Sequence, residues 1–262
     1  MISNLTVATL NVQGISTAWY AVDELIEKRI VDVLVVTETW LKEGQSVKSD
    51  YVALSITKPL APGYIGRGKG GIAVLARREL HPYITLISND SECHTVIFSV
   101  GDVTVMGCYW APSLSEELVL LQLQKLDSLP SDKPCLMIGD VNGRLGEQLN
   151  DSVSNRRGKI IANHLDSKGW QLLSRQVSKG RWTYLQGDNK SVVDWMAGNS
   201  CLQFEPSLLC IYDDAEFAGS DHKLVSCTIQ VSLDEADPTH EKTRSMMRSI
   251  VNSFFKDIKR KV

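Results

Sequence analysis

The pattern of apolar and polar positions predicts many strands with a few helices between them. Short apolar runs bounded by Gly, Pro or Asn-Asp are typical of strands, and apolar residues three or four positions apart are typical of helices. The expected strands are 5–10, 31–37, 51–57, 71–77, 95–100, 103–109, 134–138, near Leu172, 182–185, 192–196 and 224–231. The expected helices are 19–30, 115–126 and 157–166. Strands mixed with a few helices indicate an α/β sandwich, not a doubly wound parallel sheet.

Two segments allow more detailed predictions. Ser115 is expected to cap the helix over 115–126, with Leu118, Leu121 and Leu123 facing the core. Residues 234–240 resemble a linker, and beyond them apolar residues recur at an i, i+4 spacing before a basic end, which favours an amphipathic helix. We therefore expect one domain over residues 1–233, followed by a linker and a basic helix over 234–262.

Composition narrows the class of protein. With 262 residues, of which 43% are hydrophobic, the chain can bury a large core. It has no run of about 18 uncharged apolar residues and no secretory signal pattern at its start, so we expect neither a membrane span nor secretion. The six cysteines form no C-x-x-C pair. Buried reduced thiols in an intracellular protein are therefore expected, with zinc ligation as the alternative.

The net charge of −3 at first argues against nucleic acid, but its distribution does not. Residues 155–190 contain eight Lys or Arg against two Asp, whereas residues 205–221 contain five acidic residues and no basic one. A basic stretch and an acidic stretch together suit a phosphate backbone next to a metal site. The alternative is that both are ordinary solvated loops.

Polar residues recur at or just beyond the ends of the predicted strands, where a rigid strand can present a side chain to a site. They are Asn11, Glu38, Tyr109, Asp140, Asn142, Asp194, Asp221 and His222. Each alone has an ordinary explanation, such as an Asx turn or a helix cap. Asp194 is less ordinary, because a carboxylate between apolar neighbours needs a partner such as a histidine or a metal ion. Together they indicate metal-assisted cleavage of a phosphate ester.

The same residues resemble the motifs of the endonuclease/exonuclease/phosphatase superfamily, in the family's order. The matching segments are Asn11-Val12-Gln13-Gly14, Thr37-Glu38-Thr39-Trp40, Tyr109-Trp110-Ala111-Pro112, Gly139-Asp140-Val141-Asn142, Val193-Asp194-Trp195 and Gly219-Ser220-Asp221-His222. The resemblance implies a DNase I-like fold, a four-layered α/β sandwich in which two packed, mostly antiparallel sheets are flanked by helices. It places the site at one end of the sandwich.

The resemblance also implies roles for these residues. A Mg²⁺ ion, for which Mn²⁺ is a possible substitute, would be held by Glu38 with Asn11 and Asp221, since hard oxygen ligands suit it. The catalytic groups would be Asp140, Asn142, His222, Asp194 and Tyr109. Substrate contacts are expected from Arg156, Arg157, Thr183, Arg181 and Ser113.

Within the superfamily, three segments resemble the endonucleases of non-LTR (LINE-type) retrotransposons. They are Asn155-Arg156-Arg157-Gly158, the Thr183 and Asp194 segments taken together, and the Gly-rich stretch 66–73. Gln13 stands where abasic-site repair enzymes often carry Asp, and Ser113 where they usually have Asn. The sequence therefore predicts a nuclear endonuclease that nicks double-stranded DNA and leaves a 3′-hydroxyl to prime a reverse transcriptase. The alternatives are a host nuclease or phosphodiesterase of the same fold, and a nucleic-acid-binding module without activity.

Overall fold

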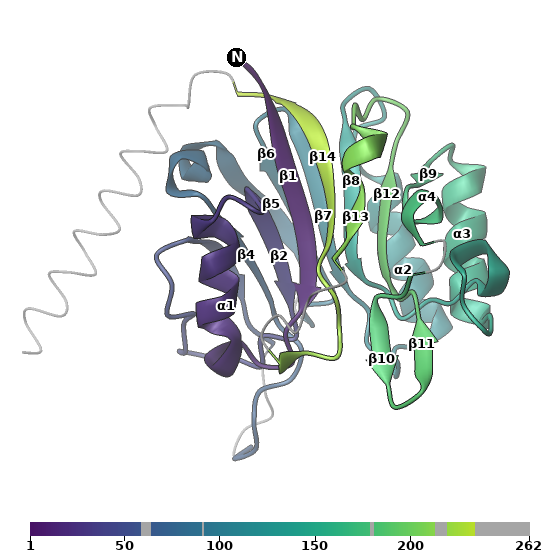
Figure 1. Ribbon diagram of the computed structural model, residues 1–262, viewed down its shortest axis with the longest axis horizontal. Coiled ribbons are helices and arrows are strands. Elements are labelled where there is room, and N and C mark those ends of the chain that lie inside the picture. The colour runs from purple at the N-terminus through teal and green to yellow at the C-terminus, as the bar shows by residue number, and fades with distance from the viewer. Residues whose placement is uncertain (59–63, 91, 179–180, 213–218, 234–262) are drawn as a thin grey trace, which may run out of the picture.

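The computed structural model describes residues 1–58, 64–90, 92–178, 181–212 and 219–233 (Figure 1). Its strands are β1 (Ile2–Asn11), β2 (Val33–Thr37), β3 (Val52–Ile56), β4 (Ile72–Ala76), β5 (Ile84–Asn89), β6 (Thr95–Val100), β7 (Val103–Tyr109), β8 (Cys135–Asp140), β9 (Gln171–Leu172), β10 (Tyr184–Gln186), β11 (Asn189–Ser191), β12 (Asp194–Gly198), β13 (Cys210–Ile211) and β14 (Val225–Ser232). Its helices are α1 (Ile15–Glu27), α2 (Glu116–Asp127), α3 (Arg156–Ser167) and α4 (Ser174–Val177). Three 3₁₀ turns are η1 (Arg78–Tyr83), η2 (Gly146–Leu149) and η3 (Pro206–Leu208). The linker and helix expected over 234–262 lie outside the described residues.

Two six-stranded sheets form the centre of the molecule. Their strand orders are β13-β14-β1-β2-β4-β3 and β5-β6-β7-β8-β12-β9. Each sheet contains one parallel pair, β1 with β2 and β7 with β8, and its other pairings are antiparallel. Parallel neighbours end at the same edge of a sheet, so Asn11 pairs in register with Thr37, and Tyr109 with Asp140. This topology places the polar strand ends of both sheets at one end of the molecule.

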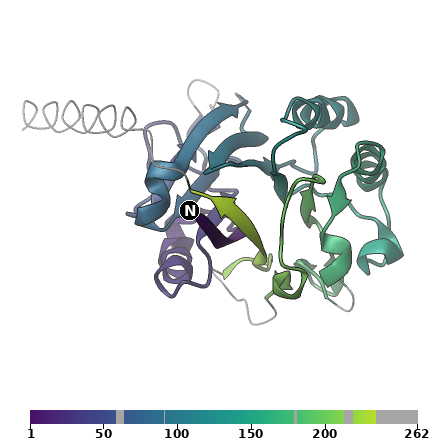
Figure 2. The same cartoon turned by 90° about the horizontal axis from the view of Figure 1, so that it is seen from above.

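Three apolar clusters separate four layers, as the α/β sandwich prediction required (Figure 2). The middle cluster joins the facing sides of the sheets, for example Val35 of β2 with Val105 of β7. A second packs α1 on the outer face of one sheet, and a third packs α2 and α3 on the outer face of the other. The expected α/β sandwich is therefore confirmed. None of the described helices is long and apolar enough to cross a membrane.

Individual elements follow the sequence pattern with instructive exceptions. Strands β6 and β7 have the expected bounds, and Ser115 caps α2 through a hydrogen bond from the Leu118 N–H. The predicted inner face of α2 is partly wrong, since Leu118 and Leu121 are 41% and 50% exposed. Leu123 faces the core as predicted, and residues 119 and 126 join it, because their spacing of four and three matches the helical repeat. Strands β5, β11 and β13 were not predicted, because their short or polar runs carry little periodic signal.

The start of α3 is held by a cap that also binds the neighbouring loop. The Asn155 side-chain oxygen accepts the N–H of Gly158 at 2.7 Å and the N–H of Arg144 at 3.0 Å. Its amide nitrogen donates to the Asn142 carbonyl at 3.1 Å. A Cβ at Gly158 would lie 2.3 Å from the Arg144 carbonyl oxygen. A glycine at this position lets helix α3 and the loop that follows β8 pack together.

We predict that Gly158→Ala lowers the free energy of unfolding by roughly 1–3 kcal/mol, because the helix and the loop must separate to admit a methyl group. Chemical denaturation measures the change. Lys159→Ala, at the next and exposed position of α3, is the control and should change stability by less than about 0.5 kcal/mol. Equal stabilities of the wild-type protein and Gly158→Ala would contradict the close approach.

Candidate active site

A hydrogen bond between the two sheets marks the centre of the site. The Asn11 side-chain amide, at the end of β1, donates to Asp140 Oδ2 at the end of β8 over 3.0 Å. Both residues are 1% exposed. Burial and then the nearby charge of Asp194 raise the pKa of the Asp140 carboxyl above its ordinary value. Asp140 is therefore a buried carboxylate with a higher proton affinity than one in water.

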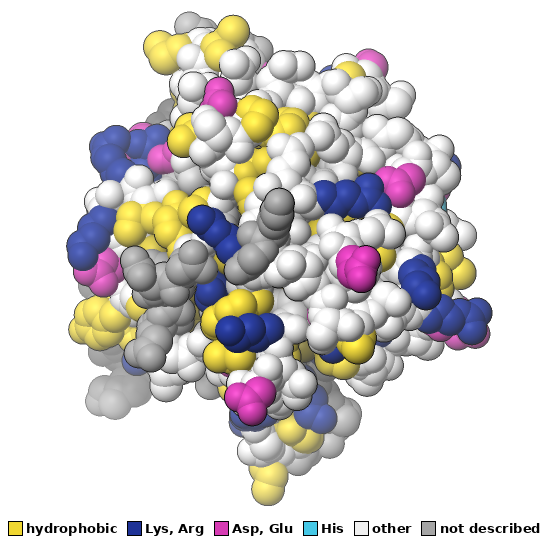
Figure 3. Space-filling view, turned by 45° about the vertical axis from the view of Figure 1, so that its right-hand side comes forward, with side chains coloured by type: hydrophobic (Ala, Val, Ile, Leu, Met, Phe, Trp, Pro, Cys, Tyr) yellow, Lys and Arg dark blue, Asp and Glu magenta, His cyan; other side chains and the backbone are white. Residues whose placement is uncertain are grey.

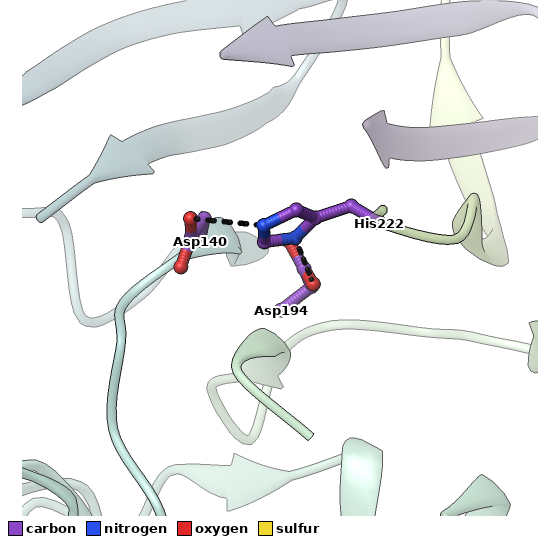
Figure 4. Close-up of side chains that lie close together, drawn as sticks. All are labelled: Asp140, Asp194 and His222. Atoms are coloured by element: carbon purple, nitrogen blue, oxygen red, sulfur yellow. Dashed lines mark hydrogen bonds and ion pairs between the residues drawn. The ribbon is translucent and has the colours of Figure 1, made fainter. Parts of the chain in front are cut away.

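His222 lies between two carboxylates (Figure 4). Its Nδ1 is 2.9 Å from Asp194 Oδ2, and its Nε2 is 4.0 Å from Asp140 Oδ2. Burial lowers the pKa of the imidazole, but the negative charges of Asp194, Asp140 and Asp221 outweigh burial and raise it to about 9. The ring is thus a buried cation at neutral pH, and its Nε2 is the nitrogen on the side of Asp140. Asp194 has the histidine partner that the sequence required.

Three residues without a sequence-derived role in catalysis hold this pair. The Ser220 hydroxyl donates to the Asn11 carbonyl at 2.6 Å and accepts the His222 N–H at 3.0 Å. The Tyr184 ring lies 4.7 Å from the His222 ring, centroid to centroid. The Thr183 hydroxyl accepts the N–H groups that begin the Asp194 segment, at 3.0 and 3.2 Å. The sequence carries no clear signal for these supports, because Thr183 and Tyr184 are far along the chain from Asp194 and His222.

Glu38 and Tyr109 form a second pair beside the first. Glu38 follows β2 with a left-handed φ of 53°, an unusual conformation for a residue with a side chain. Its Oε1 accepts the Tyr109 hydroxyl at 2.5 Å. Burial, followed by the Glu38 charge, raises the pKa of Tyr109, so the phenol stays protonated. The pair joins the ends of β2 and β7, one from each sheet.

Asn142 lies in the loop after β8 with a left-handed φ of 49°. Its backbone N–H donates to Asp140 Oδ1 at 3.0 Å, and its side-chain amide donates to the Trp110 carbonyl at 3.2 Å. A cavity of about 590 Å³ adjoins it, lined in part by Arg156, Tyr184 and Val193. A substrate in this cavity would lie against Asn142.

Two features of the site bear on whether it could hold a divalent cation, a group of possible ligands and a carboxylate oxygen beside it. Among the described residues, one group has ligand atoms within 4.8 Å of one another, namely Asp140, Asp194 and His222. In that group the imidazole Nδ1 is paired with Asp194 Oδ2 at 2.9 Å, so its Nε2 and the carboxylate oxygens are the atoms that could reach a cation. Asp221 Oδ1 has no hydrogen-bond partner and lies 3.8 Å from His222 Nε2. Asp221 therefore adds a further carboxylate oxygen beside this group, and hard cations prefer oxygen ligands.

The expected substrate contacts divide by exposure. Ser113 and Arg156 are exposed, and the Arg156 side chain, 80% exposed, forms an ion pair with Glu116 at 3.0 Å. Thr183 is 0% exposed, so the expected contact with substrate is revised to support of Asp194. Arg181 donates to the Ile211 carbonyl at 3.0 Å. Arg157 lines the cavity beside Asn142, and its terminal nitrogens donate to backbone carbonyls.

Some members of the basic stretch are paired with acidic residues. On the face in Figure 3, lysine and arginine side chains are spread among acidic and polar ones. Arg175 of this stretch pairs with Asp166, and Lys168 with Asp127. The alternative reading of the stretch as ordinary solvated charge therefore holds for these members.

The fold is an α/β sandwich, and its polar strand ends lie at one edge of both sheets. Such proteins place their site across the two sheets. The chain belongs to the Endonuclease/Exonuclease/phosphatase family, whose model matches residues 8–222. No curated protein matches the chain.

Solved structures show the same fold. The chain is similar to the AP endonuclease of Leishmania major, with a TM-score of 0.68 and 13% identity over 87% of this chain and 88% of that one. It is also similar to an AP endonuclease from Archaeoglobus fulgidus, with a TM-score of 0.58 and 15% identity over 86% and 99% of the two chains. At these identities the likeness shows the architecture alone.

Two histidine–aspartate pairs with the same 2.9 Å separation permit a matched test. The side chains of His222 and Asp194 are 5% and 1% exposed, whereas those of His164 and Asp127 are 19% and 29% exposed. We predict that Asp194→Asn lowers the free energy of unfolding by roughly 3–5 kcal/mol, because it leaves a buried cation unpaired. Asp127→Asn should cost less than about 1 kcal/mol, because water screens the pair.

Double-mutant cycles with His222→Gln and His164→Gln measure the coupling energy of each histidine with its aspartate. For Asp127 the cycle removes the contribution of its second contact, with Lys168. The coupling energy should reach about 2–3 kcal/mol for the buried pair and stay below about 0.5 kcal/mol for the surface pair. Equal coupling energies in the two cycles would refute the assignment of His222 as a buried cation held by Asp194.

Proposed function

We propose that this protein is a Mg²⁺-dependent endonuclease that nicks double-stranded DNA by hydrolysing a phosphodiester. The observation that carries the proposal is the buried line Asp194–His222–Asp140 beside the Glu38–Tyr109 pair. It puts a carboxylate with a raised pKa next to a fixed cation, and adds a phenol that stays protonated. Family membership supports hydrolysis of a phosphate ester, and the nucleic acid substrate is the finer part of the proposal.

Glu38, Asn11 and Asp221 would hold the metal ion. When bound, a divalent cation polarises a phosphate oxygen and stabilises charge on the leaving oxygen. The side-chain oxygen of Asn11 already accepts the Gln13 N–H at 3.2 Å. One of its two lone pairs then remains for the cation. Glu38 Oε1 accepts from Tyr109, so a contact with the cation suits its second oxygen. Mn²⁺ has the same preference for oxygen and is a possible substitute.

The remaining groups act on the water and the phosphate. Asp140 accepts a proton from the attacking water, and its raised pKa favours this step. The water oxygen bonds to phosphorus as the bond from phosphorus to the 3′ oxygen breaks. The departing 3′ oxygen takes a proton from solvent, which leaves a 3′-hydroxyl and a 5′-phosphate. His222 and Asn142 donate to phosphate oxygens whose charge grows in the transition state. Tyr109 joins them only when its single hydroxyl proton turns from Glu38 Oε1 to the phosphate. Asp194 keeps His222 charged and oriented.

The biological role that we propose is nicking of target DNA for a non-LTR retroelement, so that the 3′-hydroxyl primes a reverse transcriptase. The motif Asn155-Arg156-Arg157-Gly158 supports this role. Such a role requires a nuclear location and a reverse transcriptase as a linked domain or partner, with residues 1–233 as the catalytic domain. The similar AP endonuclease structures suggest abasic-site DNA as the competing substrate, and Gln13 argues against it.

We predict that the protein converts supercoiled plasmid to open circles in Mg²⁺ or Mn²⁺ and that EDTA stops the reaction. Glu38→Gln keeps an acceptor for Tyr109 but removes a negative charge from the cation site. The loss of several kcal/mol of charge stabilisation corresponds to roughly 10²-fold or more in rate. Gel quantification measures the nicking, and extension of the nick by a DNA polymerase reports the 3′-hydroxyl.

Two controls sharpen this experiment. Glu79→Gln, a change of charge at an exposed residue paired with Arg77, should nick at the wild-type rate. A duplex with one abasic site, compared with the same intact duplex, separates general nicking from repair. Cleavage confined to the abasic duplex would overturn the retroelement role, and unimpaired nicking by Glu38→Gln would overturn the metal assignment.

We further predict that Arg156 contacts a DNA phosphate. Arg156→Ala should reduce the slope of log affinity against log salt by about 0.9, the value for one phosphate contact, while the nicking rate at saturating protein is preserved. Filter binding or fluorescence anisotropy over a salt series measures the slope. Arg78→Ala removes another exposed arginine that pairs with a carboxylate, Asp50, and should leave the slope unaltered. If the slope for Arg156→Ala equals that of wild type, Arg156 does not contact a DNA phosphate and is an ordinary solvated residue.

A further inference from the structure

Arg157, beside Arg156 in sequence, has a different environment. Its two terminal nitrogens donate hydrogen bonds to backbone carbonyls in the turn between β7 and α2. The acceptors are Trp110 and Ala111, each at 3.0 Å from Nη1, with Pro112 at 3.0 Å and Leu114 at 2.6 Å from Nη2. All four N–H bonds of the terminal nitrogens are thus used, and Nε–H alone remains. A guanidinium with this pattern has little left for a phosphate.

The turn that Arg157 binds makes few hydrogen bonds of its own. Leu114 N–H donates to the Ala111 carbonyl at 2.9 Å, and Pro112 has no N–H to donate. A group of converging carbonyls is electrostatically unfavourable unless a donor lies between them. Arg157 supplies that donor from α3, so the path of the turn depends on a side chain from another element.

The Trp110 carbonyl connects this turn to the site. It accepts from Arg157 at 3.0 Å and from the Asn142 side-chain amide at 3.2 Å. A carbonyl can accept an N–H but repels another oxygen, so it determines which end of the Asn142 amide faces the turn. The second N–H and the oxygen of that amide are then presented to the site, where the Asn142 N–H already binds Asp140.

Helix α3 therefore holds Asn142 from two sides. Asn155, its cap, binds the Asn142 backbone carbonyl, and Arg157 fixes the acceptor of the Asn142 side chain. On this geometry we propose that Arg157 is a positioning residue for the reaction: it fixes the Trp110 carbonyl and thereby orients the Asn142 amide beside Asp140. This inference rests on the proposed nuclease function. It also assigns the second arginine of the Asn155–Gly158 motif a role within the protein in place of a contact with DNA.

The test uses Arg157→Lys, which keeps the charge but cannot span four carbonyls, and Arg157→Gln, whose planar amide keeps two donors. The rate of single-turnover nicking at saturating protein should fall by roughly 10²-fold in Arg157→Lys, the order expected for misplacement of a catalytic group. The dissociation constant for DNA should stay within about twofold, and the slope of log affinity against log salt should not change. Arg78→Lys, the same substitution at an exposed arginine, should match wild type in both measurements.

Asn142→Ala distinguishes positioning from general destabilisation. If Arg157 acts through Asn142, Arg157→Lys should reduce the rate by less than about threefold in the Asn142→Ala background, since residues that act as a unit are non-additive. A full second 10²-fold loss there would overturn the inference, as would a lowered salt slope with an intact rate. Should Arg157→Lys be unfolded at the assay temperature, the same cycle with Arg157→Gln decides.

A measurement without substrate separates this inference from the proposed function. The side-chain ¹⁵N–¹H signals of Asn142, identified by their absence in Asn142→Ala, should shift or broaden in Arg157→Lys and stay unchanged in Arg78→Lys. Unchanged signals in Arg157→Lys would overturn the positioning role whether or not the protein nicks DNA. A wild-type protein that fails to nick while these signals shift would instead refute the proposed function.

Discussion

The hydrogen bond from Asn11 to Asp140 is the contact on which the site depends, because it joins the two sheets where their parallel strand pairs end. Asn11 ends β1 of one sheet, and Asp140 ends β8 of the other. Packing of the sheets through the central apolar cluster sets their separation, and this bond sets the alignment of their ends. Ser220 then binds the Asn11 carbonyl and brings His222 to the same point.

Burying this much charge is costly unless each group has a partner. His222 is the cation between Asp194 and Asp140, while Asp140 also accepts the Asn11 amide and the Asn142 N–H. One oxygen, Asp194 Oδ1, remains without a hydrogen bond. The arrangement thus keeps the Asp140 carboxyl, whose pKa is raised by burial and by Asp194, at 1% exposure. The strained backbone at Glu38 and Asn142 belongs to the same region, which is typical of functional sites.

The sequence predicts the architecture well where patterns are local. Strands β6 and β7 are short apolar runs with a turn between them, and both are buried on both faces. The polar residues at strand ends meet because parallel pairing brings those ends together. A carboxylate among apolar residues requires a partner, so a histidine or a metal ion beside Asp194 was expected, and the family resemblance pointed to His222. The supports Ser220, Thr183 and Tyr184 were not expected, because their roles depend on which segments meet in space. The inner face of α2 was misplaced for a simpler reason: leucine occupies both faces of that helix, so hydrophobicity alone does not fix its orientation.

Arg156 and Arg157 show why residue type does not determine role. Successive residues of a helix point about 100° apart, so one guanidinium can face solvent while the next faces the protein. Arg156 is 80% exposed and pairs with Glu116, a carboxylate that water also reaches. Arg157 binds backbone carbonyls of the turn after β7. Among the described residues, Asn142 is the other side chain that donates to one of them. A contact with phosphate depends mainly on positive charge, so lysine can also make it. Hydrogen bonds to four carbonyls depend on the planar fork of the guanidinium, and lysine cannot replace it. The motif therefore combines a residue suited to the substrate with one suited to the site, and α3 serves both.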